Sequence, residues 1–555
     1  MTTAVRHWAK SGAPWIWLTA AAVAASLAMV LGLLLLIAVN GLGHFWPSPV
    51  WELEYRSPEG EVQQLIGQIR ETEEISVDHL RDAGATVAED AEGMVERHLL
   101  KIANRDISGL DFRWILADDI DARSRPGKLV VLERLEWGDF YGFIQALQRD
   151  GQRIAEGDAA WQELQKGLDY VDELRARIRQ LEKGEIGSIN YRIERLRLEK
   201  RKLELEGRDT PEVLADLERQ RETLQAEFSG LQRGLDELYR KIRRDTVTMT
   251  VMGGRRVDIE LASIVRAYQP NAMPLVDKIS FYVAKLWEFV SDDPREANTE
   301  GGIFPAIFGT VMMVMLMSVL VTPFGVIAAV YLREYARQGP LTRLIRIAVN
   351  NLAGVPSIVY GVFGLGFFVY FLGGNIDRLF FPEALPAPTF GTPGLMWASL
   401  TLALLTVPVV IVATEEGLSR IPASIREGSL ALGATRAETL WRTVLPMASP
   451  AMMTGVILAV ARAAGEVAPL MLVGVVKLAP ALPLDGNAPY IHLDRKFMHL
   501  GFHIYDVGFQ SPNVEAARPL VFATALLLVA VIILLNLTAI AIRNRLRERY
   551  RSLEQ

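Results

Sequence analysis

The sequence predicts a mainly α-helical, polytopic membrane protein with six transmembrane helices and a large α+β insert outside the membrane. Two observations carry this prediction. Long apolar runs occupy residues 1–45 and 300–545, whereas residues 60–270 are rich in Glu, Arg, Asp and Gln. Half of the 555 residues are hydrophobic although 22% are charged, so the average composition combines two different populations.

Composition also excludes several classes of function. The net charge of −6 is small for this length and gives no sign of nucleic-acid binding. The chain has no cysteine, which rules out disulfides, thiol catalysis and cysteine-type zinc sites. Its seven histidines do not cluster at ligand spacing, and no Gly-rich phosphate loop is present. We therefore expect no metal, no cofactor and no enzymatic activity, so that any ATP hydrolysis takes place on another chain.

The first apolar run, residues 14–41, is uncharged and long enough to span about 30 Å of hydrocarbon. Arg6 and Lys10 precede it, which favours a cytoplasmic N-terminus. A cleaved signal peptide is the alternative, but its apolar core would be only roughly 7–15 residues long. We expect a retained anchor in an N-terminal domain of residues 1–45.

Residues 46–300 contain no spanning run and are expected on the outer, periplasmic side as a small β base that carries a helical rod. Residues 110–150 indicate short strands and a helix, and 246–268 indicate two strands around Gly253-Gly254. Residues 273–292 are amphipathic, with Trp287 and Phe289 suited to the bilayer interface.

Residues 155–243 show heptad spacing and predict an antiparallel coiled-coil hairpin. Gly184 and Gly187 interrupt the first arm. Between the arms, Gly207 suits a helix C-terminus, Thr210 an N-cap and Pro211 a first helical position. The charges of this hairpin form either a solvated surface or a docking arm for a partner.

Five further spans are predicted near 304–331, 347–372, 394–414, 449–476 and 518–542, within a transmembrane domain of residues 301–545. Arginines concentrate in the segments that six spans would place inside, including a tail at 546–555. This positive-inside bias predicts that both termini are cytoplasmic.

Arg462 and Glu466 are the strongest candidate site, because they stand four residues apart in the middle of the 449–476 span. One charge at mid-bilayer costs at least about 2.5–3.5 kcal/mol, so the pair must face protein or water. Arginine offers a planar fork of donors to an oxyanion, and Glu466 would hold that fork and weaken binding enough for release. The alternative is a purely structural ion pair. Gly465 and Pro469 beside the pair allow local irregularity where a helix lines a cavity.

The segment 415–448 is too patterned for a simple connector. Ser424 or Thr414 is expected to begin a helix, Gly433 to break it and Leu445-Pro446 to close the segment. An apolar face suited to a soluble partner is formed by Leu430, Leu432, Leu440, Trp441 and Leu445. The alternative is an amphipathic loop that packs on its own spans.

These residues carry a family resemblance. Glu427-Gly-Ser, Gly433 and Leu445-Pro446 resemble the coupling signature of bacterial ABC importer permeases, EAA-x3-G-x9-I-x-LP. Gly428 and Ser429 replace the two alanines, and Thr443 replaces the isoleucine. In that family the loop inserts into a cleft of the ATPase subunit. The resemblance therefore implies a type I importer permease fold, with Glu427, Gly433, Leu445 and Pro446 as the coupling element.

Three further stretches, residues 301–310, 353–366 and 461–471, look like phosphate-uptake permeases of the PstA type, as does 500–520. The resemblance implies the permease subunit of an ATP-driven phosphate importer in the inner membrane, with Arg462 and Glu466 in the translocation path. It also implies a second permease (PstC type), an ATP-binding dimer (PstB type), a periplasmic phosphate-binding protein (PstS type) and membrane lipid as partners. Permeases for sulfate, molybdate or phosphonate, and a membrane-anchored periplasmic coiled-coil adaptor, are the alternatives.

Overall fold

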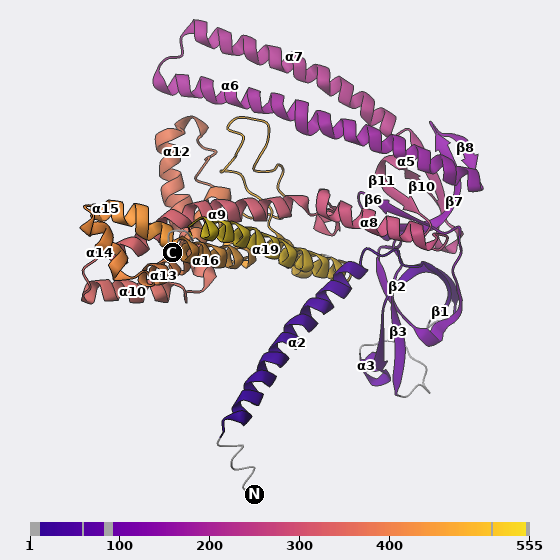
Figure 1. The fold of residues 1–555 in the computed structure, drawn as a ribbon. Coiled ribbons are helices and arrows are strands. Elements are labelled where there is room, and N and C mark those ends of the chain that lie inside the picture. Colours follow the sequence, from indigo (N-terminus) through magenta and orange to yellow (C-terminus); the bar gives the residue numbers. More distant parts are fainter. Residues whose placement is uncertain (1–10, 58–59, 83–92, 512–513, 551–555) are drawn as a thin grey trace, which may run out of the picture.

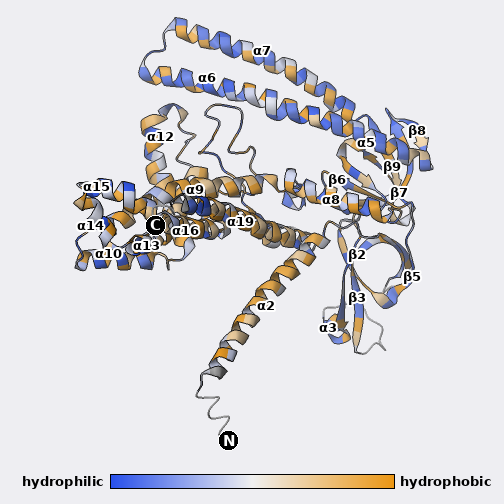
Figure 2. Ribbon diagram, in the orientation of Figure 1, coloured by the Kyte–Doolittle hydropathy of each residue, from blue (hydrophilic) through white to orange (hydrophobic). Residues whose placement is uncertain are grey.

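The computed structural model describes residues 11–57, 60–82, 93–511 and 514–550. Figure 1 shows a bundle of helices joined to a β-rich part, with a long helical hairpin that runs back alongside the bundle. The colours of Figure 2 separate two kinds of helix. The helices α2 (Ala13–Gly43), α9 (Phe304–Val330) and α19 (Val514–Tyr550) are largely hydrophobic, whereas α6 (Gly187–Glu206) and α7 (Pro211–Ile242) are largely hydrophilic. The two populations of the composition are thus two regions of the fold.

Within the described residues, six helices are long and apolar enough to cross a membrane: Trp15–Gly43, Phe304–Tyr335, Ser357–Phe380, Leu395–Ser419, Arg436–Gly465 and Ala517–Arg545. The prediction of six spans is therefore confirmed. The first, α2 (Ala13–Gly43), diverges from the bundle and approaches α19 at one end (Figure 1). At Gly41 a Cβ atom would lie 2.9 Å from the Ala523 backbone, so glycine permits this close crossing.

The described residues of the β-rich part form two large antiparallel sheets and one two-stranded sheet, β12 (Pro294–Arg295) with β13 (Glu300–Gly301). The five-stranded sheet has the order β4-β3-β2-β1-β5, and the six-stranded one has the order β10-β9-β7-β6-β11 with β8 paired to β7. Strands of the first are β1 (Trp51–Arg56), β2 (Val62–Ser76), β3 (Met94–Lys101), β4 (Phe112–Leu116) and β5 (Ile120–Ser124). Strands of the second are β6 (Val130–Arg134), β7 (Phe140–Arg149), β8 (Gln152–Glu156), β9 (Asp245–Thr250), β10 (Arg256–Glu260) and β11 (Ile264–Tyr268).

Short elements complete this part: α3 (Val77–Asp82), α4 (Arg105–Ser108), β12 (Pro294–Arg295), β13 (Glu300–Gly301) and the 3₁₀ turns η1 (Ala117–Asp119), η3 (Met252–Gly254), η4 (Leu261–Ser263) and η5 (Glu296–Asn298). The turn at Gly253-Gly254 joins β9 to β10 as predicted, although β11 makes a third strand in this region. The predicted helix within 110–150 is wrong. All of these residues are described, and they form strands and the turn η1.

The hairpin consists of α5 (Gly157–Arg179), the π-helical η2 (Gln180–Ile186), α6 (Gly187–Glu206) and α7 (Pro211–Ile242). Gly207 ends α6 in a left-handed conformation (φ 66°), and Pro211 opens α7 after Thr210. Gly184 and Gly187 do not break the first arm, because η2 carries the helix through them. Heptad coiled-coil packing along the arms stays a prediction.

The amphipathic helix α8 (Leu275–Ser291) places Trp287 and Phe289, which were both expected at the bilayer interface, in different environments. Trp287 is 72% exposed, whereas Phe289 is only 4% exposed and packs with Phe45 and Ile303. The expectation that Phe289 lies at the bilayer interface is therefore wrong, because it sits on the opposite face of the helix.

The bundle follows in chain order: α9 (Phe304–Val330), η6 (Tyr331–Tyr335), α10 (Pro340–Leu352), α11 (Ser357–Phe363), η7 (Gly364–Gly373), α12 (Gly374–Phe380), η8 (Pro382–Ala384), α13 (Leu395–Ser419), α14 (Ala423–Ala431), α15 (Arg436–Thr439), η9 (Leu440–Val444), α16 (Leu445–Gly465), α17 (Leu470–Val473), α18 (Leu500–Tyr505), η10 (Asp506–Gln510) and α19 (Val514–Tyr550). Two predicted spans differ. Residues 347–372 are not one helix, because Pro356 disfavours helical backbone at Val355 and separates α10 from α11. The 449–476 span is likewise interrupted after Gly465.

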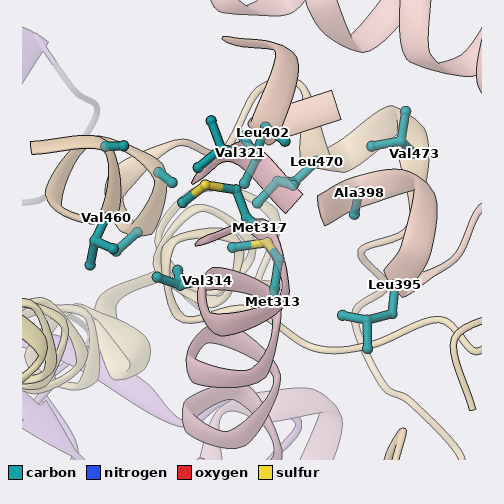
Figure 3. Close-up of a cluster of buried hydrophobic side chains, with 14 of the residues drawn as sticks. Met313, Val314, Met317, Val321, Leu395, Ala398, Leu402, Val460, Leu470 and Val473 are labelled. Carbon is teal, nitrogen blue, oxygen red and sulfur yellow. The ribbon is translucent and has the colours of Figure 1, made fainter. Parts of the chain in front are cut away.

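The bundle core lies where α9, α13, α16 and α17 meet. Figure 3 shows Met313, Val314, Met317 and Val321 of α9 gathered with side chains of the other three helices. These side chains are buried, and α13 is the most enclosed of the spans. Close packing at this junction holds the end of α16 in place.

Gly361 of α11 tests this packing, because a Cβ atom there would lie 2.7 Å from the Cα of Pro469. We expect Gly361→Ala to destabilise the purified protein by about 1–3 kcal/mol, as overpacked cores do. The measurement is the thermal unfolding midpoint in detergent. Gly366→Ala is the matched control, because a Cβ atom at Gly366 meets nothing within 4 Å. Equal midpoints for the two variants would contradict the close approach.

Candidate functional site

Arg462 and Glu466 form an ion pair, with 3.6 Å between Arg462 Nε and Glu466 Oε1. That separation is too long for a hydrogen bond, and Arg462 Nε is buried with no hydrogen-bond partner among the described residues. The side chains are 36% and 20% exposed, respectively. The pair is therefore loosely joined, and the guanidinium keeps donors available for another acceptor.

The backbone differs from the prediction at this pair. The helix α16 ends at Gly465, and Glu466 has extended backbone angles (φ −79°, ψ 130°). The expectation that both residues share one face in the middle of a helix is wrong. Arg462 lies in the last turn of the helix, where its positive charge interacts favourably with the carbonyl groups at the helix end. Glu466 lies beyond that end.

The irregular backbone after Gly465 is enclosed by close contacts. Pro469 lies against Gly361 of α11, and Val467 lies against Gly501 of α18. Gly465 itself faces open space, since a Cβ atom there would meet nothing within 4 Å. Two of the sequence stretches that carry the family resemblance, 353–366 and 461–471, thus meet at the helix end.

The second candidate region is the elbow, residues 415–448. The helix α14 begins after Pro422 and is followed by Gly433 in a left-handed conformation (φ 88°). Thr435 then caps α15 through a capping box with Glu438. Gly433 interrupts the helical structure between α14 and α15, as predicted. Thr414, however, lies inside α13, and Ser424 is the second residue of α14, so neither begins a helix as a cap.

Leu445 and Pro446 do not close the elbow. The π-helical segment η9 runs directly into α16, so residues 436–465 are continuously helical. A proline inside an α-helix removes one backbone hydrogen bond, and a π-helical turn just before it accommodates that loss. These two residues therefore lie inside the continuous helical segment that ends at Gly465, rather than at its boundary.

The elbow exposes apolar side chains on its outer surface. Leu432 is 91% exposed and Trp441 is 74% exposed, while Glu427 is also exposed and forms no ion pair with any described residue. The predicted apolar face is only partly correct, because Leu440 is buried and Leu445 is half-buried. Beneath this surface Leu418, Ile421, Val444 and Ala448 form a small core.

Two ion pairs tie this region to neighbouring helices and were missed by sequence reasoning. Arg426 of α14 pairs with Glu334 of η6 at 2.9 Å and donates to the carbonyls of Leu418 and Ile421. Arg346 of α10 pairs with Glu415 of α13 at 3.1 Å. Pairs between helices far apart in sequence leave no local signal. The spacing of Thr435 and Glu438, in contrast, is readable as a capping box.

Comparison with known proteins gives a consistent result for the helical bundle. The family described as "Binding-protein-dependent transport system inner membrane component" matches residues 321–552. The chain is 34% identical over 244 residues to the phosphate transport system permease protein PstA 1 of Mycobacterium tuberculosis (strain H37Rv), covering 44% of this chain and 70% of the relative. It is 34% identical over 265 residues to the phosphate transport system permease protein PstA of Mycobacterium leprae, and this match covers 46% of this chain and 81% of that protein.

Similarity extends to more distant relatives. The phosphate transport system permease protein PstA of Yersinia pestis is 31% identical over 252 residues, which cover 45% of this chain and 75% of that protein. Among solved structures, the inward-facing MetNI methionine ABC transporter is similar at 18% identity with a TM-score of 0.32, covering 47% of this chain and 98% of that chain.

Proposed function

The chain belongs to the family of inner membrane components of binding-protein-dependent transport systems, and from this premise we propose that it is the permease subunit of an ATP-driven phosphate importer. Relatives named as phosphate permeases that are 34% identical over the bundle support phosphate as the cargo. The observation that carries the proposal is the loosely paired Arg462 at the end of α16, near Gly465, which faces open space, in a multi-pass membrane protein.

In this proposal Arg462 and Glu466 line the translocation path. Phosphate accepts hydrogen bonds from the planar guanidinium fork, and the available donors of Arg462 suit that contact. Glu466 holds the arginine and competes with the anion for it, which limits affinity so that phosphate is released. A second, homologous permease of the PstC type would close the path on the open side of Gly465.

We infer that the elbow docks on a separate ATP-binding subunit. Glu427, Gly433, Leu445 and Pro446 would act with exposed Leu432 and Trp441. The chain has no recognisable nucleotide-binding motif of its own, so ATP hydrolysis would take place on a dimer of the PstB type. The rigid connection from the elbow through α16 would carry its movement to Arg462.

The proposed orientation places both termini and the elbow in the cytoplasm, following the distribution of arginines. Residues 46–300 would then lie in the periplasm as an insert, next to the face where a phosphate-binding protein of the PstS type docks. Transport of sulfate, molybdate or phosphonate is the second candidate, because an arginine fork suits those oxyanions as well. The family assignment weighs against the adaptor alternative.

The path assignment is tested with Arg462→Gln and Glu466→Gln in cells that depend on this transporter. We expect phosphate uptake to fall about tenfold or more for Arg462→Gln, because a charge-assisted hydrogen bond contributes about 1.5–3 kcal/mol. Glu466→Gln should change the apparent affinity and the maximal rate in opposite directions. Arg378→Gln, an exposed arginine of α12, is the control. Normal uptake by both site variants at normal membrane levels would contradict the assignment.

Docking of the ATPase is tested with Leu432→Asp and Trp441→Asp. Each variant places a charge in the proposed contact. It should weaken binding of the ATP-binding subunit by about 2 kcal/mol, which is roughly thirtyfold in affinity, and so lower the amount of that subunit recovered. The measurement is co-purification from solubilised membranes. Leu205→Asp on the hairpin is the control, since that leucine is equally apolar and also exposed. Unchanged recovery with both elbow variants would refute the docking surface.

A further inference from the structure

A cavity of about 770 Å³ lies at the junction of the two regions, where the ends of α2 and α19 meet β2, β3, α8 and β13. Figure 1 shows α2, α19, α8 and β2 converging at this place. Its volume is within the range of small-molecule sites, which is about 300–1,000 Å³. The cavity is remote from Arg462 and the elbow, none of whose residues line it.

The cavity lining combines two chemistries. Its apolar side comes from the span ends and the residues after them, including Val39, Phe45, Trp46, Leu520 and Phe522. Its charged side comes from the sheet, α8 and the β13 region, including Arg70, Lys101, Asp139, Lys285, Glu288 and Glu300. An amphipathic lining of this kind matches a ligand with an apolar part and a charged part.

The two faces of the helix α8 differ in polarity, which bears on where this cavity would lie relative to a membrane. One face of α8 exposes large apolar side chains, Leu275, Val276, Ile279, Val283 and Trp287. Its other face turns Lys285 and Glu288 to the cavity, where Lys285 also pairs with Glu133 at 2.9 Å. A helix with such faces suits the bilayer interface. In that position the cavity behind α8 would lie at the depth of lipid headgroups.

Most charges that line the cavity neutralise one another. Six pairs join lining residues: Lys101–Asp139, Arg105–Glu296, Lys285–Glu133, Lys285–Glu288, Arg295–Glu288 and Arg518–Glu71. Arg70 and Glu300 line the same cavity and form no ion pair with any described residue. One cation and one carboxyl group thus remain for a ligand that carries both an anion and a cation.

Several buried polar atoms of the lining, namely His44 Nδ1, Gln68 Oε1 and Arg295 Nε, also lack hydrogen-bond partners among the described residues. Gln68 Oε1 is an acceptor and needs a donor, and Arg295 Nε is a donor and needs an acceptor. Leaving a buried donor or acceptor unpaired destabilises a folded protein. A ligand that carries both an ammonium group and phosphate oxygens supplies a donor to Gln68 Oε1 and an acceptor to Arg295 Nε.

The electrostatics of the lining are consistent with a cation beside Glu300. Burial, and secondly the Asp139 carboxylate, raise the pKa of Glu300 to about 8. A bound ammonium group would favour the ionised form of this carboxyl group. Burial lowers the pKa of His44 to about 3, so this histidine adds no charge to the cavity at neutral pH.

We propose that this cavity binds the headgroup of an amine-bearing phospholipid such as phosphatidylethanolamine, with Arg70 and Arg295 at the phosphate and Glu300 and Gln68 at the ammonium group. The apolar residues at the ends of α2 and α19 would contact the first part of the acyl chains. The bound lipid would join the β-rich region to the span ends. This site is independent of the anion that the permease carries.

The test uses the full-length protein, purified and delipidated in detergent, and native mass spectrometry to count bound lipids. Phosphatidylethanolamine and phosphatidylglycerol with the same acyl chains are titrated separately. We expect phosphatidylethanolamine to bind about tenfold more tightly, because only it offers an ammonium group to Glu300. Free phosphoethanolamine and inorganic phosphate should fail to displace it at equal concentration, which distinguishes a lipid from a soluble ligand.

Variants separate headgroup recognition from a general loss of folding. Glu300→Gln should abolish the preference between the two lipids, and Arg70→Gln should weaken binding of both. Asn40→Trp fills the cavity from α2 without changing a charge and should block both lipids. Glu54→Gln and Arg256→Gln are exposed controls outside the cavity and should bind like the unmodified protein. Equal binding of the two lipids, displacement by free phosphoethanolamine, or unchanged binding by Glu300→Gln and Asn40→Trp would overturn the proposal.

Discussion

The membrane half of this protein depends on how the end of α16 is enclosed. A helix end leaves carbonyl groups without intrahelical partners, and in a membrane such groups must be satisfied by protein or water. Arg462 lies in the last turn of α16, and the backbone after Gly465 is covered by Pro469 against Gly361 and by Val467 against Gly501. Glycines at these contacts let helices approach closely enough to exclude lipid. The same packing leaves Gly465 facing open space, and the side chains of the neighbouring ion pair are 36% and 20% exposed.

The elbow at the other end of the same helical segment is built differently. It has a small apolar core, a capping box and a left-handed glycine, and two ion pairs fix it to η6 and α10. Because residues 436–465 are continuously helical, the elbow and Arg462 belong to one helical segment. In the proposed function, this segment connects the exposed Leu432 and Trp441, where a partner would bind, to the ion pair.

Sequence patterns predicted the features that depend on local composition. They failed where contacts between distant residues determine helix breaks, side-chain burial and strand order. Six apolar runs became six candidate spans, and Gly207, Pro211 and Gly433 act at helix boundaries as their backbone preferences indicate. Gly465 and Pro469 were expected to allow local irregularity, but residues 449–476 were still predicted as one span, because a run of apolar residues has the same hydropathy whether it is one helix or two. Phe289 and Leu440 were placed on the wrong surfaces for a related reason, since an apolar residue at an amphipathic helix edge suits either lipid or a core. The sheet topology and the Arg426–Glu334 pair depend on residues far apart in the chain and have no local signature.

The central claim is that the segment after Gly465 lines an aqueous path that the transported anion enters. The chain has no cysteine, so Ala468→Cys introduces a single thiol next to the ion pair in the half-buried segment. The most direct measurement is the rate at which a membrane-impermeant maleimide modifies this thiol in the assembled transporter, with and without phosphate. Our account predicts that the thiol reacts and that phosphate slows the reaction. A thiol that is unreactive from both sides of the membrane, or that reacts at a rate phosphate does not change, would contradict it.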